Sequence, residues 1–360
     1  MNTVGIISLL SAAVYWLAGW FLFFGVRRLD TVQSQTGRRP CSVIIPARNE
    51  EKTLPVLLES LQKQRAKIEE IIVVNDASDD RTAEVAARYG CRVVDLTGKP
   101  DGWSGKAWAC WNGAKKATSA TIVFLDADVV CGENAIQLLL SAHDQQGGLV
   151  SAQPKHRTEK LYEQISAFFN IVSVAAAGKR GGFGPCMACS RHDYFKVGGH
   201  EAIRENIVDD FALARLFIEN GKKVTSFLGG AQLSFRMYPG GIRDLIEGWT
   251  KNMASGLSLS NPASVILIFV WFTGIINAVL SLIRSAGNSQ VVFIAGSVIV
   301  FALYAAQVAL LLSRVGRFYF ITSLFFPLFL LFFLVFFFVS ALLTAVFKKV
   351  RWKGRVIYLR

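Results

Sequence analysis

Histidine, paired cysteines and glycine-rich nucleotide motifs are scarce in this sequence. The 360 residues include 4 histidines and 6 cysteines. Cys186 and Cys189 form a lone C-x-x-C without a second pair or a histidine at zinc-finger spacing, which argues against a zinc site. No G-x-G-x-x-G follows the first predicted strand, so a dinucleotide-binding fold is disfavoured. Gly102 and Gly105 are too close together for a phosphate loop, and Ala107 stands where such a loop needs Ser or Thr, so an NTPase is rejected.

Charged residues are absent from long apolar segments at both ends of the chain. Hydrophobic residues make up 52% of the sequence, and residues 4–26, 263–283, 291–312 and 318–347 contain no Asp, Glu, Lys, Arg or His. A stretch of about 20 apolar residues is long enough to span a bilayer, whereas transporters usually need ionisable residues at membrane depth. These segments predict transmembrane helices at both ends and argue against a transporter.

Basic residues next to the first apolar segment predict its orientation. Residues 4–26 have neither a basic start nor a clear cleavage site, so we expect an anchor and not a removed signal peptide. Arg27, Arg28, Arg38 and Arg39 follow, and the positive-inside rule places residue 27 onward in the cytosol of a multi-pass plasma-membrane protein. Cysteines in a cytosolic domain remain thiols. The net charge of +13 favours an anionic membrane surface as the partner of this protein and not a nucleic acid.

The last apolar segment leaves the number of spans open. Four spans would put the basic tail, residues 348–360, outside the cell, against the positive-inside rule. At roughly 1.5 Å per residue, residues 318–347 are also too long for one perpendicular span, and Pro327 permits a bend. This segment therefore either crosses the membrane or bends back and re-enters.

Strand and helix patterns alternate between residues 41 and 155. Strands are predicted at residues 41–45, 70–74, 92–95, 121–125 and 149–153, and helices at residues 49–64, 81–89, 104–118 and 134–143. This order predicts an α/β domain with a mostly parallel sheet. Ligands of such sheets bind outside the carboxyl ends of the strands.

Polar and acidic residues follow three of these strands. The first strand leads into Pro46, Ala47, Asn49 and Glu50, the second into Asp76, and the strand at 121–125 into Asp126-Ala127-Asp128. Two carboxylates one residue apart suit a divalent cation such as Mg²⁺ or Mn²⁺, which completes its coordination with phosphate oxygens. A lone D-x-D is more often a turn or a cap, but acids gathered at one sheet edge, with Lys106 as a nearby cation, favour a binding site.

Five motifs occur in order between residues 42 and 213, namely residues 42–51, 73–80, 105–106, 126–128 and 208–213. Together they resemble the family 2 glycosyltransferases of the GT-A fold, over roughly residues 40–260 of this chain. The resemblance implies inverting sugar transfer from a UDP-sugar, with glucose as the expected sugar. It also implies that Asp128 and Asp126 bind the metal and that Asp210 is the base, beside Asp209, which replaces the family's usual Glu. The donor-binding residues that it implies are Pro46, Ala47, Asn49, Glu50, Asp76, Lys106, Asp126, Ala127 and Asp128.

Further segments, at residues 184–186, 197–200, 235–238 and 247–251, resemble the bacterial enzymes that glycosylate the carboxyl group of a C30 apocarotenoid acid, 4,4'-diaponeurosporenoate. This resemblance implies a carotenoid acceptor contacted by Gly184, Pro185, Arg236, Trp249 and Lys251. The Q-x-x-R-W of processive synthases is not intact, which favours a single transfer. A hydroxyl lipid of the ceramide, hopanoid or diacylglycerol type and a polyprenyl phosphate remain alternative acceptors, and a nucleotide-sugar-binding scaffold without turnover is the alternative from another class.

We expect five regions along the chain, at residues 1–28 (anchor), 29–240 (cytosolic GT-A domain), 241–262 (amphipathic interfacial segment), 263–347 (transmembrane helices) and 348–360 (basic tail).

Simpler interpretations exist for several of the named residues. Asp209 and Asp210 could serve only to complement a helix dipole, and Trp249 and Lys251 could serve only as interfacial anchors. His192 and His200 are interpreted as structural.

Overall fold

The computed structural model describes residues 3–34, 40–206, 208–259, 261–342, 349–352 and 355–358. The chain forms two compact units. We call Val26–His156 with Lys179–Met237 the sheet unit, and Met1–Gly25 with Arg157–Gly178 and Tyr238–Arg360 the apolar-helix unit. Each unit is described by itself.

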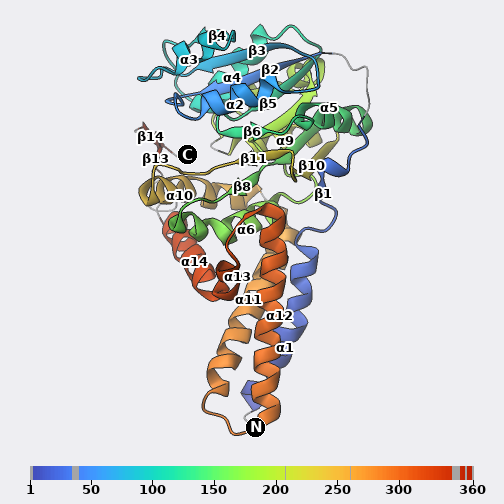
Figure 1. Cartoon of the computed structure of the whole chain (residues 1–360), viewed down its shortest axis with the longest axis vertical. Helices are drawn as coiled ribbons and strands as arrows, with labels where there is room; N and C mark the ends of the chain where they lie inside the picture. The colour runs from blue at the N-terminus through green and yellow to red at the C-terminus, as the bar shows by residue number, and fades with distance from the viewer. Residues whose placement is uncertain are drawn as a thin grey trace. The chain divides into compact units, whose positions relative to one another are not determined.

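The sheet unit is built on eight strands in the order β1-β10-β7-β9-β5-β2-β3-β4 (Figure 1). Every neighbouring pair is parallel except those that β9 forms with β5 and β7. The predicted α/β domain with a mostly parallel sheet is therefore confirmed. The strands are β1 (Arg27–Arg28), β2 (Cys41–Ala47), β3 (Ile68–Asn75), β4 (Arg92–Asp95), β5 (Thr121–Leu125), β7 (Leu149–Gln153), β9 (Cys186–Ser190) and β10 (Val224–Leu228).

The helices of this unit lie close to their predicted bounds, as α2 (Leu54–Gln62), α3 (Thr82–Arg88), α4 (Gly105–Lys116) and α5 (Ala135–Gln146). The first begins later than predicted because the preceding residues form a turn. Asn49 has a positive φ of 55°, and the Glu50 N–H donates to Thr82 Oγ1 at 2.8 Å. Shorter elements complete the unit, namely η1 (Leu29–Thr31), β6 (Val129–Cys131), α7 (Arg191–Lys196), α8 (Gly199–Ala202), α9 (Asp209–Glu219), β11 (Leu233–Phe235) and β8 (Lys155–Arg157).

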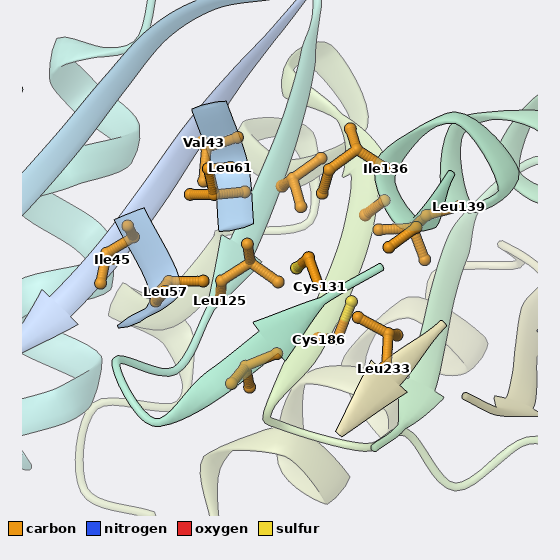
Figure 2. Packing of buried hydrophobic residues seen from close by; sticks show 14 of the residues in the cluster. Val43, Ile45, Leu57, Leu61, Leu125, Cys131, Ile136, Leu139, Cys186 and Leu233 are labelled. Carbon is orange, nitrogen blue, oxygen red and sulfur yellow. The ribbon is translucent and has the colours of Figure 1, made fainter. Parts of the chain in front are cut away.

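The main core of the sheet unit lies where α2 and α5 cover the sheet. Figure 2 shows Leu57 and Leu61 of α2 and Leu139 of α5 around the strand residues Val43 and Leu125. These side chains are buried, with 3% exposure or less. Parallel strands covered on both faces are apolar along their length, which is why the runs at 41–45 and 121–125 could be recognised as strands.

Within its described residues, the apolar-helix unit contains three helices that are long and apolar enough to cross a membrane. They are α1 (Thr3–Phe21), α11 (Pro262–Ser285) and α12 (Val291–Val315), and they pack against one another (Figure 1). Polar side chains connect them: Tyr304 Oη donates to the Ala12 carbonyl at 2.9 Å, and Trp271 Nε1 donates to Gln307 Oε1 at 2.8 Å. Hydrogen bonds of this kind join apolar helices in a bilayer.

The rest of this unit comprises η2 (Leu161–Ser166), α6 (Ala167–Ala177), α10 (Ile242–Leu259), β12 (Gly316–Arg317), α13 (Phe320–Leu324), α14 (Phe326–Leu342) and the hairpin β13 (Lys349–Trp352) with β14 (Arg355–Tyr358). The apolar segment predicted at residues 318–347 is divided into α13 and α14 at Phe325, and residues 343–347 lie outside the described part. Pro327 occupies the first turn of α14, where its missing N–H breaks no helical hydrogen bond.

Candidate functional site

The turns after β2 and β3 are joined at the carboxyl edge of the sheet. The Asp76 N–H donates to the Ala47 carbonyl at 2.9 Å, and Arg48 Nη1 donates to the Asp76 carbonyl at 2.8 Å. Asn49 Oδ1 accepts from the Asp79 N–H at 2.9 Å. Because β2 lies between β3 and β5, with all three strands parallel, the polar residues that follow them gather at one edge, as the sequence predicts.

Asp126 of the D-x-D follows β5 and forms an ion pair. Lys106 Nζ lies 2.6 Å from Asp126 Oδ1. Lys106 is in the first turn of α4, whose start is capped by Ser104 Oγ, which accepts from the Ala107 N–H at 3.2 Å. A cation at a helix N-terminus opposes the helix dipole. Burial also disfavours the Lys106 ammonium, but the Asp126 and Asp209 carboxylates outweigh it and raise the pKa of Lys106 well above its ordinary value.

Asp128, the second acid of the motif, is costly to ionise. Burial, with the charges of Asp126 and Glu50, raises the pKa of Asp128 to about 7. A divalent cation would offset this unfavourable charge, so the donor set fits a hard metal ion. In the described part of the chain, no group of three or more His, Cys, Asp and Glu side chains is arranged to hold an ion. A metal here would need further oxygens, as the phosphates of a nucleotide provide.

Asp210 lies at the start of α9 with both carboxylate oxygens bound to backbone amides. Oδ2 accepts from the Gly184 N–H and Oδ1 from the Phe211 N–H, each at 2.9 Å. Burial and the adjacent Asp209 carboxylate nevertheless raise the pKa of Asp210 to about 6. A carboxylate held in one orientation, with a pKa near the working pH, is suited to act as a general base.

The segment at Gly184 and Pro185 connects the two acidic motifs. The Asp126 N–H donates to the Pro185 carbonyl at 3.0 Å, one residue after the amide that binds Asp210. A Cβ atom added to Gly184 would lie 3.0 Å from Asp210 Oδ2, so a side chain here would push against the Asp210 carboxylate. The structure therefore brings Gly184 and Pro185, predicted as acceptor residues, into contact with Asp210 and Asp126.

Two buried residues behind Asp209 were not predicted as part of the site. Tyr194 Oη lies 2.8 Å from His200 Nδ1 and accepts from the His200 N–H at 3.1 Å. His200 Nε2 faces Asp209 Oδ2 at 3.7 Å. Both Tyr194 and His200 are fully buried. His200 was interpreted as structural; the only sequence signal for its position was its place in the segment at residues 197–200.

The remaining predicted residues lie in several parts of the structure. Ala127 is buried with 4% exposure, as is Ala47 with 2%, and Arg236 follows β11 in the sheet unit. Trp249 belongs to α10 of the apolar-helix unit, where its ring stacks on Phe169 with centroids 3.9 Å apart. Lys251 is also in α10, and its side chain lies outside the described part. The acceptor role of these last residues stays a prediction.

Comparison with known proteins identifies relatives over most of the chain. Residues 42–194 match the family model described as glycosyl transferase family 2. The 4,4'-diaponeurosporenoate glycosyltransferase of Staphylococcus aureus strain N315 is 34% identical over 351 residues, which cover 94% of this chain and 93% of that protein. The protein of the same description from strain USA300 is 36% identical over the same shares of both chains.

Among solved structures, the fold is similar to that of the mannosyltransferase PcManGT from Pyrobaculum calidifontis, determined in complex with GDP-Man and Mn²⁺. The TM-score is 0.57 at 17% identity, and the match covers 96% of this chain and 99% of that one. This likeness concerns the fold and extends over both units.

Proposed function

The chain belongs to glycosyl transferase family 2, and from this premise we propose that it transfers glucose from UDP-glucose to the carboxyl group of a membrane-borne apocarotenoid acid. The chain is a glycosyltransferase. The observation that supports sugar transfer at this edge of the sheet is the link through Gly184 and Pro185, which joins the acids at the end of β5 to Asp210 at the start of α9. The acceptor is proposed from the description of the relatives.

The donor is proposed to bind at the carboxyl edge of β2, β3 and β5. Asp76, held against Ala47 and Arg48, is the expected partner of the nucleoside, and Lys106 supplies positive charge for the diphosphate. Asp128 would hold a divalent cation, which neutralises charge on a leaving diphosphate. Asp126, already paired with Lys106 at 2.6 Å, orients that lysine and is the second candidate ligand.

The transfer forms one bond and breaks one at the anomeric carbon. An oxygen of the acceptor attacks from the face opposite the diphosphate, and the electron pair of the broken C–O bond leaves with the nucleotide. A carboxylic acid with a pKa near 4–5 is already ionised at neutral pH, so it needs no base. It needs orientation and a compensating cation, for which we propose either Arg236 or Lys251.

A lipid hydroxyl is the second candidate acceptor, and one observation favours it. Asp210 is fixed by two backbone amides and has a pKa of about 6, which suits removal of a hydroxyl proton. The carboxylate is preferred because the relatives that match over 94% of the chain are named for an apocarotenoid acid.

We further propose that the protein resides in the plasma membrane with the sheet unit in the cytosol, since Arg27 and Arg28 directly follow the first apolar segment.

Mass spectrometry of lipid extracts tests the proposal in a host that makes an apocarotenoid acid. Expression of the chain should produce a new lipid heavier by one hexose than the acid. The Asp128→Ala variant, expressed at the same level, is the matched control and should produce none. Conversion of a hydroxyl lipid with the apocarotenoid acid unchanged would contradict the proposed acceptor and support the second candidate.

A further inference from the structure

The two helices that follow α12 are short in the described part of the chain and sharply divided from each other. At roughly 1.5 Å per residue, the 17 described residues of α14 extend about 25 Å. Phe325 separates α14 from the five residues of α13. Figure 1 shows the chain leaving α12, running to α13 and returning along α14 towards α10.

Aromatic contacts show the direction in which α14 runs along its neighbours. Phe326, its first residue, lies against the middle of α12, with ring centroids 4.9 Å from Phe301. By helical rise, Phe301 is about 21 Å from the end of α12 at Val315. Phe333, two turns later, contacts Phe272 at 5.6 Å, about 15 Å from the start of α11. The beginning of α14 is therefore deeper among the spanning helices than its middle.

The far end of α14 reaches an amphipathic helix. Ser340 Oγ donates to the Thr250 carbonyl of α10 at 2.6 Å. The first turns of α10 carry Arg243, Asp244 and Glu247, which belong in the polar interface and not in the hydrocarbon core. The end of α14 is thus held at the level of that interface.

Hydrogen bonds hold the start of α13 against Gln164 of η2, close to the C-terminal end of α12. Gln164 Oε1 accepts from the Tyr319 N–H at 3.0 Å and from Thr322 Oγ1 at 2.7 Å, and Gln164 is fully buried. Arg314 and Arg317 lie just before α13 and mark the end of α12 as a membrane boundary with positive charge.

The outward face of both helices is apolar and exposed. Phe320 is 79% exposed, Leu331 58% and Phe338 67%, whereas Phe333 on the opposite face is 5% exposed. A surface of this kind, continuous with the spanning helices, fits hydrocarbon chains and not water.

We propose that α13 and α14 form a re-entrant hairpin, which enters one leaflet beside the C-terminal end of α12, turns at Phe325 and returns to the same side, with its outer face against lipid hydrocarbon. The chain then has three spans. The basic tail lies on the same side as Arg27 and Arg28, which satisfies the positive-inside rule where four spans would violate it. The hairpin does not depend on the identity of the sugar or acceptor.

Cysteine labelling of the full chain in cells tests the hairpin. One variant is Ser289→Cys, in the loop between α11 and α12, and the other carries a cysteine added after Arg360. Both also carry Cys91→Ser, because the other five native cysteines are buried. With a membrane-impermeant maleimide, Ser289→Cys should react in intact cells and the tail cysteine only after permeabilisation.

The comparison of the two positions separates the hairpin from the proposed orientation. If the pattern is reversed, the hairpin stands and the orientation proposed above is wrong. Reaction of both positions under the same condition, whether in intact or only in permeabilised cells, overturns the hairpin. As a second measurement, benzoylphenylalanine at Leu331 should cross-link to phospholipid on irradiation, whereas the same group at Phe333 should not; equal yields would contradict the lipid-facing surface.

Discussion

Lys106 and Asp126 form an ion pair, 2.6 Å between Nζ and Oδ1, where α4 begins and β5 ends. Replacement of Lys106 by Met leaves the Asp126 carboxylate without its closest cation and removes the positive charge expected to face the diphosphate. We expect Lys106→Met to lower kcat/KM by about 100-fold, equivalent to roughly 2.7 kcal/mol. Lys116→Met, at the exposed end of the same helix, is the control and should have little effect.

The contribution of the Lys106–Asp126 ion pair to stability can be measured separately from the role of the Lys106 charge in catalysis. A partly buried acid that has lost its partner destabilises the folded state, whereas removal of both charges costs less. The Lys106→Met variant should therefore unfold at lower temperature than the wild type, and Lys106→Met with Asp126→Asn should recover part of the loss. Identical unfolding temperatures for the single and the double variants would contradict this interpretation.

We expect the binding of a divalent cation and of the nucleotide to depend on Asp128. Because burial and two neighbouring acids raise the pKa of Asp128 to about 7, a divalent cation that binds there should stabilise the ionised form and the folded protein. We expect Mg²⁺ or Mn²⁺ with UDP to raise the unfolding temperature of the wild type but not of Asp128→Asn. Full transfer activity of either protein in excess EDTA would show that the D-x-D is not a metal site.

Gly184 is expected to be intolerant of a side chain. The added methyl of Gly184→Ala would lie 3.0 Å from Asp210 Oδ2 and 3.1 Å from its Cβ, so Asp210 or the segment at Pro185 must shift. A shift at Pro185 also displaces Asp126, whose N–H donates to the Pro185 carbonyl, and a misplacement of this kind near reacting groups should reduce kcat by at least about 10-fold. Gly98→Ala is the matched control, since nothing lies within 4 Å of its added Cβ; equal activities of the two variants would argue against a role for the contact.

The pH dependence of the rate distinguishes the two acceptor classes. If Asp210 must be ionised to accept a hydroxyl proton, the rate should fall as the pH falls through about 6, where this acid takes up a proton. If the acceptor is a carboxylate with a pKa near 4–5, the rate at a saturating concentration of divalent cation, which keeps Asp128 ionised, should be nearly constant above pH 6. We expect the second profile, together with a loss of less than about tenfold for Asp210→Asn, because the missing base would otherwise cost about 10²–10⁴-fold.

The sheet and the acidic edge were predictable from the sequence because they depend on local patterns. The apolar runs before Asp76 and Asp126 determine strand ends, and parallel strands bring these ends together whatever the details of packing. The start of α2 was predicted too early because the turn after β2 depends on Asn49 in a positive-φ conformation and on hydrogen bonds to the segment after β3. Such long-range partners leave no periodic signal.

The position of His200 and the path of α13 and α14 could not be predicted for the same reason: both depend on long-range contacts. His200 contacts Tyr194, which lies six residues earlier in the chain, but its approach to Asp209 depends on how α8 and α9 pack. An apolar run of uniform composition such as residues 326–342 is consistent with a span or with a hairpin. Contacts made by particular residues, Phe326 with Phe301 and Ser340 with Thr250, distinguish the two.

The linkage in the purified product is the most direct test of the central claim, that the sugar is transferred to a carboxyl group. Mild alkali cleaves a glycosyl ester but leaves a glycoside intact, so the product should be incubated in alkali and analysed by mass spectrometry beside a known lipid glycoside. We predict complete release of the hexose and recovery of the free apocarotenoid acid, while the glycoside is unchanged. A product that keeps its hexose under these conditions would contradict the account and identify a hydroxyl as the acceptor.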